Sequence, residues 1–157
     1  MTSLYLSLGT NLGDKPANLH RAVALLEERL QTPRAALSSF LETAPWGYES
    51  SNSFLNACIR FDLDLPATRP EARRILALCK DIENEMGRIQ RAPGEGYKDR
   101  AIDIDILLFG TLRMRTKTLT IPHPLMRERE FVTVPLKEIT KSFAGKDFID
   151  IFAKEMN

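Results

Sequence analysis

The chain has 157 residues, of which 43% are hydrophobic and 27% are charged, and its formal net charge is +1. This length suits one domain spanning residues 1–157, and the near-neutral charge excludes a surface that attracts nucleic acid or anionic lipid as a whole. The first residues contain no basic leader, and no segment approaches the roughly 18 apolar residues that span a bilayer, so we expect a cytoplasmic protein.

The first half of the chain predicts a strand, a helix and two further strands. Residues 4–8 alternate as a strand does, and the glycine-containing turn that follows leads to Asp14, which can cap a helix continuing to about Leu30. Two more strands are predicted over residues 35–42 and 54–65. The segment between them is rich in Pro, Gly, Ser and Asn and is too long for a tight hairpin turn, so we expect a mobile lid.

A second amphipathic helix follows. Thr68 and Glu71 form a capping box at its start, and Gly87 can end it. Cys79 lies on its apolar side and Cys58 lies in the preceding strand, so both cysteines are expected to be reduced core residues.

Two strands and a short helix complete the prediction. The polar loop 89–100 leads into a strand at 101–109, and a further strand at 118–122 precedes a short helix after Pro124. The order of elements is that of an α+β ferredoxin-like sandwich, with helices packed on a mainly antiparallel sheet.

Two aspartates stand out in the strand at 101–109. Asp103 and Asp105 alternate with isoleucines, so both carboxylates leave one face of the strand about 7 Å apart. Such a pair repels unless protons or cations intervene, and Mg²⁺ is typically bound by one or two carboxylates together with substrate phosphates. The alternative is a solvated edge strand whose charges discourage aggregation.

Basic residues flank this strand in the sequence, as a polyphosphate substrate requires. They are Arg88, Arg91, Lys98 and Arg100 before it, and Arg113, Arg115, Lys117, His123, Arg127 and Arg129 after it.

Six motifs occur in an order that resembles the 6-hydroxymethyl-7,8-dihydropterin pyrophosphokinase family of folate biosynthesis. They are LSLGTNLGD (6–14), ETAPWG (42–47), FLNA (54–57), IENEMGR (82–88), RAIDIDILLFG (100–110) and LTIPHPLMREREFV (119–132).

The resemblance implies transfer of a pyrophosphoryl group from ATP to the hydroxymethyl oxygen of the pterin, leaving AMP, with two Mg²⁺ ions on Asp103 and Asp105. Both aspartates then count as catalytic, together with Arg88 and Arg100. The implied ATP-binding residues are Glu83, Arg88, Arg100, Ile106, Thr120, His123 and Arg129. For Glu83, an exposed helical residue that pairs with Lys80 is the alternative.

A pterin is flat and aromatic with polar edges, so its pocket requires stacking surfaces and a few polar groups. The implied pterin-binding residues are Thr43, Pro45, Trp46, Phe54, Asn56 and Phe131. An asparagine in an apolar strand also favours a ligand partner, because an unpaired buried amide is costly. The chain departs from the family pattern at Gln90, where an arginine is usual, and we expect Arg91 to take its place.

Two other functions fit parts of the pattern. A metal-dependent nucleotidyl transferase also uses two aspartates on a small α+β sheet, and a non-catalytic ferredoxin-like module binds RNA or a small ligand. The absence of a long basic groove argues against nucleic acid as substrate or partner. We therefore expect small-molecule substrates only, no membrane partner, and a monomer.

Overall fold

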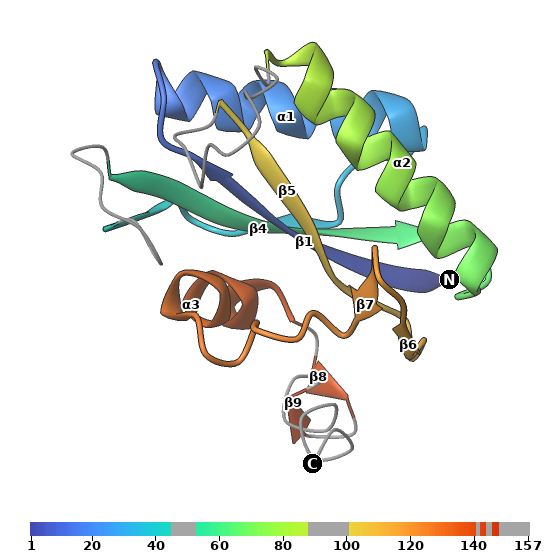
Figure 1. The fold of residues 1–157 in the computed structure, drawn as a ribbon. Helices are drawn as coiled ribbons and strands as arrows, with labels where there is room; N and C mark the ends of the chain where they lie inside the picture. Colours follow the sequence, from blue (N-terminus) through green and yellow to red (C-terminus); the bar gives the residue numbers. More distant parts are fainter. Residues whose placement is uncertain (45–52, 88–100, 141, 144–145, 148–157) are drawn as a thin grey trace.

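A computed structural model gives the fold, and it describes residues 1–44, 53–87, 101–140, 142–143 and 146–147. The described part contains three helices and nine strands (Figure 1). In chain order these are β1 (Thr2–Thr10), α1 (Lys15–Leu30), β2 (Ala36–Leu37), β3 (Leu41–Thr43), β4 (Phe54–Leu63), α2 (Arg69–Glu85), β5 (Asp103–Phe109), β6 (Met114–Arg115), β7 (Thr120–Ile121), α3 (Glu130–Ile139), β8 (Ser142–Phe143) and β9 (Lys146–Asp147).

The main sheet has the strand order β2-β4-β1-β5, and β3 also pairs with β4. Each of these pairs is antiparallel. The helices α1 and α2 cover one face of the sheet, and α3 lies against the other (Figure 1). The ferredoxin-like α+β prediction is therefore confirmed.

The sheet divides the core into two clusters. Alternation along β1 sends Leu4, Leu6 and Leu8 toward α1 and α2, and sends Tyr5 toward α3. The cluster under α3 is smaller. Its buried members are Tyr5, Cys58, Leu107, Leu108, Met126, Val132, Leu136 and Ile139.

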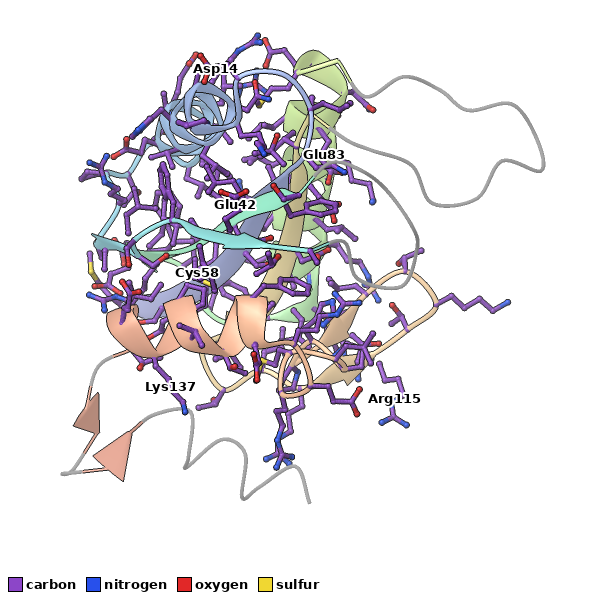
Figure 2. All side chains as sticks on the ribbon, turned by 90° about the vertical axis from the view of Figure 1, so that its left-hand side faces the viewer. Asp14, Glu42, Cys58, Glu83, Arg115 and Lys137 are labelled. Carbon is purple, nitrogen blue, oxygen red and sulfur yellow. The ribbon has the colours of Figure 1, made fainter. Side chains whose placement is uncertain are left out.

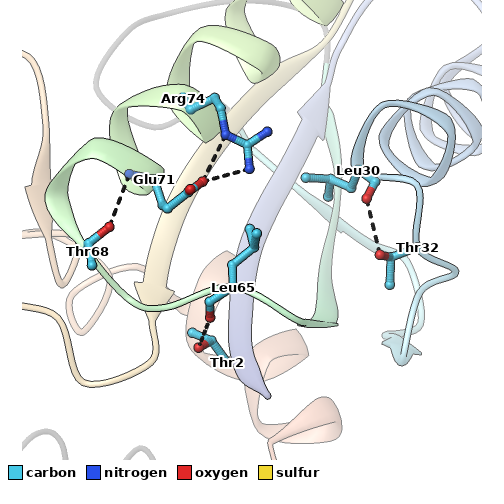
Figure 3. Close-up of polar contacts among 7 residues, drawn as sticks. All are labelled: Thr2, Leu30, Thr32, Leu65, Thr68, Glu71 and Arg74. Carbon is cyan, nitrogen blue, oxygen red and sulfur yellow. Dashed lines mark hydrogen bonds and ion pairs between the residues drawn. The ribbon is translucent and has the colours of Figure 1, made fainter.

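Both predicted helix starts are confirmed by their caps. The Asp14 carboxylate accepts a hydrogen bond from Ala17 N at 3.1 Å. Thr68 Oγ1 accepts from Glu71 N, and Figure 3 shows this bond beside the one from Thr2 Oγ1 to Leu65 O, which holds the start of β1 to the segment before α2. The Thr2 bond joins the first residue of β1 to a residue 63 positions later in the sequence.

The predicted strand at 35–42 is wrong in one respect, because it is two short strands, β2 and β3. Ser38 still bonds to β4 through its amide and its hydroxyl, which contact Cys58 O and Cys58 N at 2.9 Å. The amide of Ser39 instead donates to Glu138 of α3 at 2.8 Å. The backbone therefore leaves the sheet where a helix carboxylate offers a competing acceptor.

The C-terminal prediction needs two adjustments. The strand at 118–122 is the short β7, which pairs with β6 outside the main sheet. Turns occupy residues 124–128 before α3 begins at Glu130. The predicted loop at 89–100 and most of the predicted lid lie outside the described residues. No helix in the described part of the chain is long and apolar enough to cross a membrane.

Both cysteines are fully buried, as predicted. Burial raises the pKa of Cys79 to about 12, and the nearby carboxylates of Glu83 and Asp105 add to this effect. Burial also raises the pKa of Cys58, with a further contribution from Glu138. Cys58 lies between the sheet and α3, where its Sγ is 3.6 Å from Val132 O (Figure 2).

We expect neither thiol to react with a chromogenic aromatic disulfide in the native protein at a pH of about 8, because the thiolate is the reactive form. Both should react in denaturant. Absorbance after reagent addition measures this, and rapid labelling of even one thiol without denaturant would contradict the buried placement.

Candidate active site

The register of three strands brings the predicted site residues into rows across the sheet. Asp103 of β5 pairs with Gly9 of β1, and Gly9 pairs with Asn56 of β4. The next row contains Asp105 and Ser7. These side chains lie on the face toward α3, because the residues that alternate with them pack under α1 and α2.

Asp103 and Asp105 are both half-buried and share this face, as the alternation predicted. Strand β5 is an edge strand, so that part of the alternative interpretation is correct, but the two carboxylates point toward the α3 side of the sheet and are only partly open to solvent. Within the described ranges, no group of three or more His, Cys, Asp or Glu side chains could hold a metal ion. Two carboxylates fit Mg²⁺, which takes its other ligands from phosphates and water.

Glu83 lies on the other side of β5, near the end of α2 (Figure 2). Its side chain is 2% exposed, and Oε2 accepts a hydrogen bond from Ile104 N at 2.9 Å. This amide belongs to the residue between the two aspartates. The alternative of an exposed helical residue is therefore wrong. The spacing of four from the buried Cys79 is the sequence signal that predicts burial.

His123 lies beside the aspartate strand. Its amide donates to Leu107 O at 3.0 Å, and its Nδ1 accepts from Leu125 N at 3.2 Å. Burial lowers the pKa of His123, the positive charge of Arg129 lowers it further, and Asp103 acts in the opposite direction. The imidazole is therefore neutral at neutral pH, with its proton on Nε2, because Nδ1 is already an acceptor.

Arg129 and Phe131 flank the beginning of α3. The guanidinium carbon of Arg129 is 5.6 Å from the centroid of the Phe131 ring, which is cation–π geometry. Phe131 also packs against the cluster under α3. The arginine and the phenylalanine thus contact each other at the N-terminal end of α3.

Strand β4 contributes Asn56 to the candidate site, and this side chain is 4% exposed. Its Nδ2 donates to Thr43 Oγ1 at 2.9 Å and to Leu41 O at 3.2 Å. The amide thus has protein partners, which the sequence argument for a ligand did not foresee. A Cβ on Gly9 would lie 3.2 Å from Asn56 Oδ1, which is tighter than an ordinary contact, and 3.7 Å from Phe54, which is an ordinary van der Waals distance, so an added methyl group would press on the Asn56 amide.

Two predicted ATP-binding residues occupy different surroundings. Ile106 is 3% exposed and its side chain belongs to the core under α1 and α2, so only its backbone on the edge strand can contact a ligand. Thr120 is half-buried on β7. The other predicted residues lie outside the described ranges, and these are Pro45, Trp46, Arg88, Arg91 and Arg100.

A profile of the 7,8-dihydro-6-hydroxymethylpterin-pyrophosphokinase (HPPK) family matches residues 5–141. The chain belongs to the HPPK family. The family resemblance predicted from the motifs is therefore confirmed.

Curated relatives agree with the HPPK assignment. A 2-amino-4-hydroxy-6-hydroxymethyldihydropteridine pyrophosphokinase of Porphyromonas gingivalis is 41% identical over 140 residues, which are 88% of this chain and 91% of the relative. The enzyme of the same name from Bacillus subtilis is 39% identical over 135 residues, covering 86% of this chain and 76% of the relative. In the Dictyostelium discoideum folic acid synthesis protein FOL1, the match is 37% identical and covers 89% of this chain but 20% of that protein.

A solved structure also matches the HPPK chain. The crystal structure of an HPPK-DHPS in complex with substrates has a TM-score of 0.64 and 13% sequence identity, and it covers 98% of this chain and 43% of that one. At this identity the likeness shows the shared fold.

Proposed function

We propose that this HPPK-family chain transfers the pyrophosphoryl group of ATP to the hydroxymethyl oxygen of 6-hydroxymethyl-7,8-dihydropterin. The oxygen attacks the β-phosphorus, the bond from that phosphorus to the α–β bridging oxygen breaks, and AMP leaves as the hydroxyl proton is released. The supporting observation is the row Asp103–Gly9–Asn56, because it places a carboxylate of the metal pair and a polar pocket residue on one face.

In this proposal Asp103 and Asp105 hold two Mg²⁺ ions. Bound there, the ions neutralise charge on the β- and γ-phosphates. The neutral His123 donates its Nε2–H to a phosphate oxygen, and Arg129 adds positive charge beside it. Arg88 and Arg100 remain predicted phosphate contacts, since arginine suits forked recognition of phosphate oxygens.

The pterin occupies the same face in this proposal. Phe54 and Phe131 supply aromatic surfaces, and Thr43 and Asn56 supply polar atoms at the rim. The bond between Thr43 Oγ1 and Asn56 Nδ2 fixes the orientation of that amide. A fixed amide recognises a pterin edge better than a freely rotating one, because less side-chain freedom is lost on binding. Pro45 and Trp46 are the remaining predicted lining.

Incubation with ATP, Mg²⁺ and the reduced pterin tests the activity. AMP and a pterin diphosphate should form in equal amounts, measured by chromatography. ADP as the product would contradict pyrophosphoryl transfer, and a nucleotide polymer would indicate the nucleotidyl transferase. A cytoplasmic location and a monomeric state are part of the same proposal.

We expect Gly9→Ala to raise the KM for the pterin about tenfold, since overpacking costs about 1–3 kcal/mol and 1.4 kcal/mol is tenfold. The added methyl group would push against Asn56 Oδ1. Steady-state kinetics with each substrate varied in turn measure this effect, and the KM for ATP is the internal control. An unchanged pterin KM would show that the pterin lies elsewhere.

A further inference from the structure

Lys15 occupies an unfavourable position for a cation. It is the first residue of α1, whose first turn contains no acidic residue. The positive end of the helix dipole lies there, so a lysine charge is disfavoured unless it has another partner. That partner is Ser53, because Lys15 Nζ donates to Ser53 Oγ at 3.1 Å and to Ser53 O at 3.3 Å.

Ser53 extends the contact to β3. Its hydroxyl donates to Glu42 Oε1 at 2.6 Å, a length typical of a strong bond to a carboxylate. The ammonium, the hydroxyl and the carboxylate therefore form one chain of hydrogen bonds with a charge at each end. We call Lys15, Ser53 and Glu42 the α1 clamp. It joins the beginning of α1 to the end of the β3–β4 pair.

The α1 clamp lies behind the pocket rather than in it. Glu42 pairs with Leu55, which packs against the core under α1 and α2. Ser53 precedes Leu55 by two residues and shares its face. Thr43 pairs with Phe54 on the opposite face, the one that contains the proposed pterin site. The clamp therefore acts on the pocket through the backbone.

We propose that Lys15 is a positioning residue that holds the β3–β4 end against α1 and so fixes Thr43 and Phe54 for the pterin. This inference rests on the proposed function, since the substrate of that pocket is part of it. Ser53 adjoins Phe54 directly, so a displacement of one moves the other. The competing interpretation is an ordinary surface contact, which affects neither substrate.

Lys15→Met tests the clamp. The KM for the pterin should rise about three- to tenfold, the size expected for the net contribution of one typical hydrogen bond, whereas kcat and the KM for ATP stay at the parental values. The melting temperature should not fall, because removal of a cation from the helix start favours α1. A merely structural lysine would lower the melting temperature and leave the pterin KM unchanged.

Three further variants sharpen the test. Lys15→Arg keeps the charge and the donors and should restore the pterin KM. Lys80→Met, the same substitution at an exposed lysine of α2, should have parental kinetics. In a Ser53→Ala background, Lys15→Met should raise the pterin KM by a smaller factor than it does alone, because the bond to Ser53 Oγ is already lost and only the bond to the carbonyl oxygen of residue 53 remains.

A parental pterin KM in Lys15→Met would overturn the inference. Failure of the proposed function is distinct, since the parental protein would then form no AMP. In that case, the pterin is titrated in the presence of an unreactive ATP analogue. Fluorescence then gives the dissociation constant of the pterin for the parent and for the variant. A weaker constant in Lys15→Met supports the clamp, and equal constants or no binding overturn it.

Discussion

We expect Asp103→Ala and Asp105→Ala each to lower kcat by about a thousandfold or more while the protein stays folded. A metal held by these carboxylates supplies several kcal/mol of transition-state stabilisation, and each 1.36 kcal/mol is a factor of ten in rate. Stability stays near the parental value or rises slightly, because each change removes one of two like charges on one face of β5.

Initial rates with saturating ATP, Mg²⁺ and pterin measure the loss, and thermal unfolding measures the fold. Asp81→Ala is the matched control, since Asp81 is exposed on α2 and belongs to none of the predicted site residues. A large fall in melting temperature with proportionate loss of rate would assign the aspartates a structural role. Titration of Mg²⁺ gives a second readout, since single variants should need far more metal for residual activity.

We expect Glu83→Ala to lower both stability and turnover. The change leaves Ile104 N without its acceptor, and an unsatisfied buried donor costs about 1–3 kcal/mol, or about 2–12 °C in melting temperature at this size. Turnover falls because the freed amide lies between Asp103 and Asp105, so the backbone that aims both carboxylates loses its support.

Glu83→Gln distinguishes a structural role of Glu83, as the acceptor for Ile104 N of β5, from a direct contact with ATP. Glutamine keeps an acceptor oxygen of nearly the same shape, so we expect stability and the KM for ATP close to those of the parent. Differential scanning calorimetry and ATP-dependent rates measure the two quantities. If Glu83→Gln keeps the parental melting temperature but raises the KM for ATP, the carboxylate charge contacts the nucleotide, as the family resemblance implied.

Local patterns in the sequence predicted those structural features that depend on residues close together in the chain. The period of two in the aspartate strand predicted the shared face of both carboxylates, and Asp14 and Thr68 predicted where two helices begin. The family motifs predicted the family itself. These signals succeed because a strand's alternation and a helix cap involve residues within three or four positions of each other.

Other features depend on residues far apart in the sequence, and single-sequence patterns do not contain them. Ser39 leaves the sheet because Glu138, 99 positions away, accepts its amide. Asn56 has its amide partners in β3 because of the β3–β4 register. Neither contact has a local signature, so each appeared only when the strands and α3 were packed together.

The sequence by itself thus determined the family, the order of elements and the face on which Asp103 and Asp105 lie, because short-range periodicity and motifs encode these directly. Only the tertiary structure decided that Glu83 supports β5 from behind and that Lys15 reaches Ser53. One contact joins a helix to a strand, and the other joins a helix to the residue just before a strand, at distances set by packing and register rather than by spacing along the chain.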